Sequence, residues 1–192
     1  MSQSRTRAHT LHKPHLLLHV CCAACATYVL QVLREDFNVT GFFCNPNIQP
    51  ESEYNLRRLQ LERYATQVAM PFHVADYHVE RWFRLVSQHE RDPEGAQRCS
   101  ICYRMRLEDT ARFAAEHGYG YFTTTLSVSP HKRAQVINPM GHELARTYPV
   151  KFHAADFKKR DGFKISCELS RQFGLYRQTY CGCLFSRSPG NR

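Results

Sequence analysis

The chain has 192 residues, of which 43% are hydrophobic, and this suffices for one domain with a buried core. No apolar run approaches the roughly 20 residues that cross a bilayer, and the first ten residues contain no apolar stretch of the kind found in secretory signals. We therefore expect a cytoplasmic protein rather than a membrane or secreted one.

The net charge of +9 is concentrated at the two ends of the chain. Residues 1–20 hold three basic and no acidic side chains, and residues 151–192 hold nine basic and three acidic ones, so the ends contribute +3 and +6. The second segment also alternates basic with aromatic residues, at 157–160 and at 175–180. This alternation suits phosphate contact with base stacking, although a solvated surface can have the same composition.

Short apolar runs alternate with longer segments of helical periodicity. Strands are expected at 15–20, 39–43, 72–74, 121–124 and 150–153. Helices are expected at 23–34, 51–69, 79–89, 99–117, 131–147 with a break at Pro139, and 166–178. This order predicts a single α/β domain with a parallel sheet of five strands and helices on both faces. We expect the domain to span 15–186, with a flexible basic end at 1–14 and a flexible end at 187–192.

Seven of the nine cysteines lie in three short clusters. The clusters are Cys21, Cys22 and Cys25; Cys99 and Cys102; and Cys181 and Cys183. Thiolates at this spacing can share a metal or pair with each other, whereas cysteines that fill a core are scattered singly. In a reducing compartment, ligation or redox chemistry is favoured over a structural disulfide framework. The other two, Cys44 and Cys167, are expected to be core or surface thiols.

The first cluster directly follows the first expected strand. In an open parallel sheet the ligand crevice lies at the carboxyl ends of the strands, where Asp156 is also expected. The second cluster lies at a loop-to-helix junction, where a helix N-terminus stabilises thiolate charge. Four thiolates suit a [4Fe-4S] cluster or a structural zinc, with inert buried thiols as a further alternative. The strand-end position favours iron, because structural zinc is usually held by short knuckles on loops.

The third cluster and Asp156 have several interpretations. Cys181-Gly-Cys183 can close only a small, strained disulfide ring, which would be readily reduced. It therefore suggests a redox dithiol beside the metal, with extra metal ligands or unused thiols as alternatives. Asp156 could bind iron, handle protons or position a substrate, and it could equally be a helix N-cap or half of a surface ion pair.

Several motifs follow one another between residues 15 and 186. They are Val-Cys-Cys-Ala-Ala-Cys at 20–25, Asn-Pro-Asn-Ile at 45–48, Cys-Ser-Ile-Cys-Tyr at 99–103, Thr-Thr-Thr-Leu at 123–126, Asp-Phe-Lys-Lys at 156–159, Leu-Tyr-Arg-Gln at 175–178 and Cys-Gly-Cys at 181–183. This series resembles the QueH family of epoxyqueuosine reductases, with Ala24 where the family commonly has Pro. The resemblance implies a Rossmann-like fold of the nucleotide α-hydrolase group. It also implies a cobalamin-independent enzyme that reduces the epoxide of epoxyqueuosine, at the tRNA wobble position, to queuosine in the last step of making that base.

The resemblance also assigns roles to matching residues. The implied ligands of a [4Fe-4S] cluster are Cys21, Cys22, Cys99 and Cys102. Cys25 is a candidate ligand for an additional iron, Cys181 and Cys183 are the implied redox pair, and Asp156 would handle iron or protons. The residues expected to contact tRNA phosphates are Lys158, Lys159, Arg160 and Arg177. The implied partners are tRNA carrying epoxyqueuosine and an external electron donor.

Two other functions share some of these features. An ATP-using tRNA-modifying enzyme of the same fold group would hold pyrophosphate in a Ser-Gly-Gly-rich loop after the first strand, but residues 21–25 contain no glycine. An iron-sulfur or zinc regulator that binds RNA would use its cysteines only for structure or redox sensing. Such a regulator would have no need of the Cys181-Gly-Cys183 pair.

Overall fold

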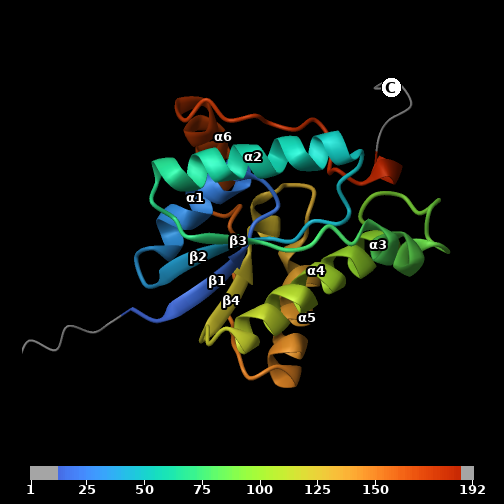
Figure 1. The fold of residues 1–192 in the computed structure, drawn as a ribbon, viewed down its shortest axis with the longest axis horizontal. Helices are drawn as coiled ribbons and strands as arrows, with labels where there is room; N and C mark the ends of the chain where they lie inside the picture. Colours follow the sequence, from blue (N-terminus) through green and yellow to red (C-terminus); the bar gives the residue numbers. More distant parts are fainter. Residues whose placement is uncertain (1–12, 187–192) are drawn as a thin grey trace, which may run out of the picture.

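The computed structural model describes residues 13–186, which form one five-stranded parallel sheet flanked by helices (Figure 1). The strands are β1 (His15–His19), β2 (Asn38–Phe43), β3 (Phe72–Val74), β4 (Tyr121–Thr124) and β5 (Lys151–Phe152). The helices are α1 (Ala23–Leu33), α2 (Glu51–Gln67), α3 (Val79–Val86), α4 (Gln97–Glu116), α5 (Ala134–Thr147) and α6 (Gly162–Gln172), with short 3₁₀ helices η1 (Thr125–Val128) and η2 (Leu184–Ser186). The expected α/β fold is confirmed. The expected flexible ends fall almost wholly outside the described residues.

The sheet is buried on both faces, which explains why three successive leucines form the middle of β1. Leu16 and Leu18 pack in a core with residues of α1 and α2, whereas Leu17 packs in a second core with residues of α4 and α5. Figure 1 accordingly shows α1 and α2 on one side of the sheet and α4 and α5 on the other. None of the described helices combines the length and apolar character needed to cross a membrane.

The strand order β3-β2-β1-β4-β5 places β1 at the centre of the sheet. From β1 the chain first adds β2 and β3 on one side and then returns to add β4 and β5 on the other. The order therefore reverses between β1 and β4, and ligand crevices of open parallel sheets lie at the carboxyl ends of the strands at such a reversal. Residues that follow β1 and β4 are thus brought together.

Helix bounds differ from the prediction by a few residues, and two helices show the differences that matter most. The predicted break at Pro139 is wrong, because α5 runs continuously through this residue. Proline removes one helical hydrogen bond, and the burial of Ile137 and Leu144 of α5 against the sheet offsets that cost.

The last helix is predicted over 166–178, but α6 begins earlier, at Gly162, and ends earlier, at Gln172. Gly174 adopts a left-handed φ of 61°, and the amide of Leu175 donates to the carbonyl of Ser170 at 2.8 Å. This arrangement is a typical glycine-terminated helix end. The chain is consequently irregular from residue 175 up to η2, and residues 175–186 are called here the C-terminal strap.

Candidate active site with a metal-binding thiol group

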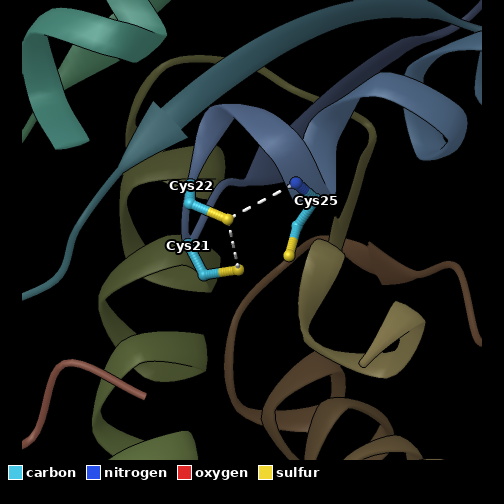
Figure 2. A group of neighbouring side chains, drawn as sticks. All are labelled: Cys21, Cys22 and Cys25. Carbon is cyan, nitrogen blue, oxygen red and sulfur yellow. Dashed lines mark hydrogen bonds between the residues drawn. The ribbon is translucent and has the colours of Figure 1, made fainter. Parts of the chain in front are cut away.

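Three thiols meet where β1 ends and α1 begins. The sulfur atoms of Cys21, Cys22 and Cys25 all lie within 4.8 Å of one another, and Figure 2 shows them converging from this junction. Cys22 is the N-cap of α1, and its Sγ accepts a hydrogen bond from the Cys25 amide at 3.4 Å. The first turn of the helix thus brings Cys25 back beside the strand end. Within residues 13–186 no other group of three or more His, Cys, Asp or Glu side chains is close enough to hold a metal ion.

The three thiols differ in acidity because they contact one another. Hydrogen bonds from the thiols of Cys22 and Cys25 lower the pKa of Cys21 well below its usual value. The contact with Cys21 in turn raises the pKa of Cys22 to about 12, and it raises the pKa of Cys25 well above its usual value. Without a metal the group therefore favours a single thiolate. A bound metal cation would favour deprotonation of the other two thiols, because the thiolate is the form that ligates a metal.

Two donors from distant parts of the chain orient these sulfur atoms. Thr125, directly after β4, donates from Oγ1 to Cys21 Sγ at 3.2 Å, and this Oγ1 also accepts from the Cys21 amide at 3.1 Å. Gln178 of the C-terminal strap donates from Nε2 to Cys22 Sγ at 3.1 Å. The thiol group is therefore held by both the sheet and the strap.

A buried arginine lies next to this site. Arg106 of α4 is 2% exposed and donates to Asn45 Oδ1 at 2.5 Å and to His19 Nε2 at 3.3 Å. Burial and the Arg106 charge lower the pKa of His19 to about 3, so this imidazole stays neutral and can accept the bond. Arg106 also points toward Cys102 Sγ, 3.9 Å from Nη1. Arg106 is not among the site residues predicted from the sequence, although its spacing of four residues from Cys102 places both on one helix face.

The second cysteine cluster lies on the first turns of α4. Cys99 is partly exposed, and its Sγ accepts from the Gly95 amide at 3.2 Å. Cys102 is buried in a small core with Trp82 and Cys183, and this burial raises its pKa. Neither belongs to the close group formed by the first cluster. Their assignment as cluster ligands stays a prediction.

A cavity of about 360 Å³ opens beside the first cluster. Its walls include Cys21 and Cys25 from the β1–α1 junction and Cys181 from the C-terminal strap. The charged residues in these walls are Arg57, Arg106, Lys132, Arg177 and Glu94, which gives the cavity an excess of positive charge. Burial opposes the charge on Lys132, but the facing groups, Cys181 first among them, raise its pKa above its usual value.

The two strap cysteines have different surroundings. Cys181 is partly exposed and lines the cavity, whereas Cys183 is buried with Trp82, and burial raises its pKa to about 12. All nine cysteines are free thiols, so the expected disulfide is not present in this state. The role of Cys181 and Cys183 as a redox pair stays a prediction.

The family model described as "Epoxyqueuosine reductase QueH" matches residues 16–189. This chain belongs to the QueH family. Epoxyqueuosine reductase QueH of Streptococcus pyogenes serotype M1 is 38% identical over 180 residues, which cover 91% of this chain and 71% of the relative. Epoxyqueuosine reductase QueH of Thermotoga maritima is 37% identical over 175 residues, with 89% of each chain covered. The resemblance seen in the motifs is thereby confirmed.

The fold of this QueH chain also has a solved counterpart. The U34-tRNA thiolase NcsA from Methanococcus maripaludis, solved with its [4Fe-4S] cluster, superposes with a TM-score of 0.57 at 10% sequence identity. The superposition covers 92% of this chain and 62% of the thiolase. At this level of identity the likeness establishes the fold.

The remaining predicted site residues of this QueH chain follow β5. Asp156 forms an ion pair with Lys158 at 2.8 Å and is not among the residues that line the described cavity. The ion pair was one of the alternatives left open for Asp156, and its catalytic role stays a prediction. Lys159 and Arg160 are exposed. Arg177 lines the cavity and donates to Ser170 Oγ at 2.8 Å.

Proposed function

We propose that this QueH chain is an epoxyqueuosine reductase, which removes the epoxide oxygen of epoxyqueuosine in tRNA and leaves queuosine. The observation that carries this proposal is the cavity beside the ends of β1 and β4. Its lining includes Cys21 and Cys25 of the three-thiol group and Cys181 of the predicted redox pair. A metal centre and a dithiol on one cavity would together supply the electrons and the protons that a reductive deoxygenation consumes.

The electron balance gives the strap cysteines a defined task. Converting an epoxide into an alkene and water consumes two electrons and two protons. Closing a disulfide between Cys181 and Cys183 breaks two S–H bonds and releases two electrons and two protons. The two half-reactions therefore match, and an external thiol or dithiol reductant would reopen the disulfide for the next turnover.

The first cysteine cluster has the composition of an iron-sulfur site. Its three soft sulfur donors all lie within 4.8 Å of one another, as ligands of one metal centre must. We assign Cys21, Cys22 and Cys25 as ligands, with Cys99 and Cys102 as candidates for remaining positions. A [4Fe-4S] cluster held there would supply electron transfer. An additional iron has no separate ligand group within residues 13–186, because its candidate, Cys25, lies with Cys21 and Cys22.

The cations of the cavity suit a polyanionic substrate. Arg177 and Lys132 line the same cavity as Cys181, where they could bind phosphate groups beside the modified base. Lys132 would also stabilise negative charge on the oxygen that leaves the epoxide. Tyr180 and Phe163 line the same cavity and offer rings on which a base could stack.

The two alternative functions have less support. An ATP-using enzyme would need glycine amides to cradle pyrophosphate after β1, and this position holds the three-thiol group instead. A regulator that binds RNA would have no turnover. The presence of turnover therefore separates the reductase from the regulator.

The test is anaerobic conversion of tRNA that carries epoxyqueuosine. Iron-loaded protein with a strong chemical reductant should yield queuosine, which nucleoside mass spectrometry detects as the loss of one oxygen. Reductant with heat-denatured protein is the control for uncatalysed reduction. If iron-loaded, folded protein never removes the oxygen with any reductant, the proposed reductase function is wrong.

A further inference from the structure

The C-terminal strap is attached to α2 by a buried arginine. Arg57 is 2% exposed, and its guanidinium Nε donates to Glu53 Oε1 at 2.7 Å. The other two nitrogens donate to the strap backbone, Nη1 to the carbonyl of Cys181 at 3.0 Å and Nη2 to the carbonyl of Tyr180 at 3.2 Å. The planar fork of arginine thus spans two successive carbonyls at the redox cysteine.

Further contacts hold the same part of the strap against the loop before α2. The Gln49 amide donates to the Gly182 carbonyl at 2.8 Å, and Gln49 Oε1 accepts from the Leu184 amide at 3.1 Å. Gly182 has a φ of 108°, and a Cβ at this position would lie 3.0 Å from Arg57 Nη1. The glycine between the two cysteines therefore serves both the turn and the close approach of the arginine.

These attachments decide where the two thiols lie. With the backbone held at residues 180–182, Cys181 lines the cavity beside Cys21 and Cys25, and Cys183 enters the core that contains Trp82. Arg57 could pair with Glu53 without contacting the strap, so its bonds to the strap carbonyls are a separate feature. Its neighbour Arg58 makes the equivalent pair with Glu62, at 2.7 Å, on the partly exposed side of α2.

We infer that Arg57 is a positioning residue for the redox pair: its bonds to the carbonyls of Tyr180 and Cys181 hold the strap in the dithiol arrangement, with Cys181 at the cavity and Cys183 buried. The inference rests on the proposed function, because only a reductase uses these thiols in turnover. Closing the disulfide must bring the two sulfur atoms together and so disturb this arrangement. Arg57 therefore stabilises the reduced form and makes the pair a stronger oxidant.

The test compares Arg57→Gln and Arg57→Lys with the matched control Arg58→Gln. Iron-loaded protein without tRNA is equilibrated anaerobically in glutathione buffers and quenched with an alkylating agent, and mass spectrometry then quantifies the Cys181–Cys183 disulfide. Arg57→Gln should shift the equilibrium about tenfold toward the disulfide, which corresponds to a potential roughly 30 mV lower. Arg57→Lys keeps the charge but has no fork, so its shift should be smaller, and Arg58→Gln should match the wild type.

A second measurement follows the accessibility of each thiol. In reduced Arg57→Gln the alkylation rate of Cys183 should rise at least severalfold, because a released strap no longer keeps it in the core. Iron content and the melting temperature identify a variant that fails to fold. If Arg57→Gln does not fold, Tyr180→Phe is used in its place. This change removes the 2.6 Å bond from Tyr180 Oη to the Gln49 carbonyl and should also shift the thiol equilibrium toward the disulfide.

The inference is overturned if the Arg57 variants fold and show the wild-type dithiol–disulfide equilibrium and wild-type alkylation rates. If the Arg57 variants do not fold, a wild-type equilibrium in Tyr180→Phe overturns it. Neither measurement depends on turnover. If the thiol equilibrium shifts as expected while the wild-type protein never deoxygenates tRNA, the positioning role of Arg57 holds and the proposed reductase function fails.

Discussion

The two thiol groups that meet at the cavity are held by different kinds of structure. Cys21, Cys22 and Cys25 lie at the junction of a buried central strand with α1, where main-chain hydrogen bonds of the sheet and helix fix the backbone and two side chains orient the sulfur atoms. Cys181 and Cys183 lie in the C-terminal strap, which side chains of α2 and its preceding loop hold in place. A rigid junction suits a metal centre, whose geometry must persist. An irregular strap suits a dithiol, whose sulfur atoms must move during oxidation.

The largest effect is expected at the rigid junction. Cys22→Ser keeps a good N-cap for α1 but replaces a soft sulfur ligand with a hydroxyl, so the protein should fold while losing bound iron and all activity. Iron, acid-labile sulfide and visible absorbance of anaerobically purified protein measure the loss. The matched control is Cys167→Ser on α6, which should keep its iron. Full iron and sulfide in Cys22→Ser would show that the first cluster does not hold the metal.

The same measurement tests the two remaining predicted ligands. Cys99→Ala and Cys102→Ala should each lose the iron-sulfur absorbance, because a missing thiolate leaves one iron undercoordinated. Retention of full colour in both would remove α4 from the ligand set and leave the metal to the β1–α1 junction.

The strap should show a different pattern, in which the metal stays and turnover is lost. Cys181→Ser and Cys183→Ser should keep wild-type iron, but with a thiol donor their rate should fall to roughly a hundredth, because neither can close the disulfide proposed to supply two electrons. A strong low-potential reductant should restore part of the rate. Initial rates with both donors provide the measurement. If both variants equal the wild type with every donor, the cysteine pair carries no electrons in this reaction.

The rigid junction could be predicted from the sequence, and the strap could not. Cys21, Cys22 and Cys25 are neighbours in the chain, so a strand end and one helical turn suffice to place them together. By contrast, Arg57 and Cys181 are 124 residues apart in the sequence, and a charged residue in a helix pattern gives no sign that it will be buried. The helix predicted over 166–178 includes four of the six strap residues before Cys181. In the structure the left-handed turn at Gly174 ends the helix before them, despite their helical pattern. Local geometry follows from local sequence, whereas a segment held by distant side chains requires the structure.

The smallest effect is expected for cations outside the cavity. Lys159 and Arg160 are exposed after β5, at the same edge of the sheet as the cavity, whereas the charge of Lys158 is already paired with Asp156. Lys159→Ala combined with Arg160→Ala should therefore weaken tRNA binding severalfold and reduce the slope of log affinity against log salt by about one to two units.

Filter binding or fluorescence anisotropy over a range of salt concentrations measures this slope. The matched control is the double variant Lys13→Ala with Lys151→Ala, since both residues are exposed at the amino ends of strands, on the opposite edge of the sheet. This control should bind tRNA with the wild-type slope, and both double variants should keep full iron. If the two double variants show the same slope of log affinity against log salt, tRNA does not approach along the loop after β5. Arg177 of the strap, which lines the cavity, would then be the remaining predicted phosphate contact.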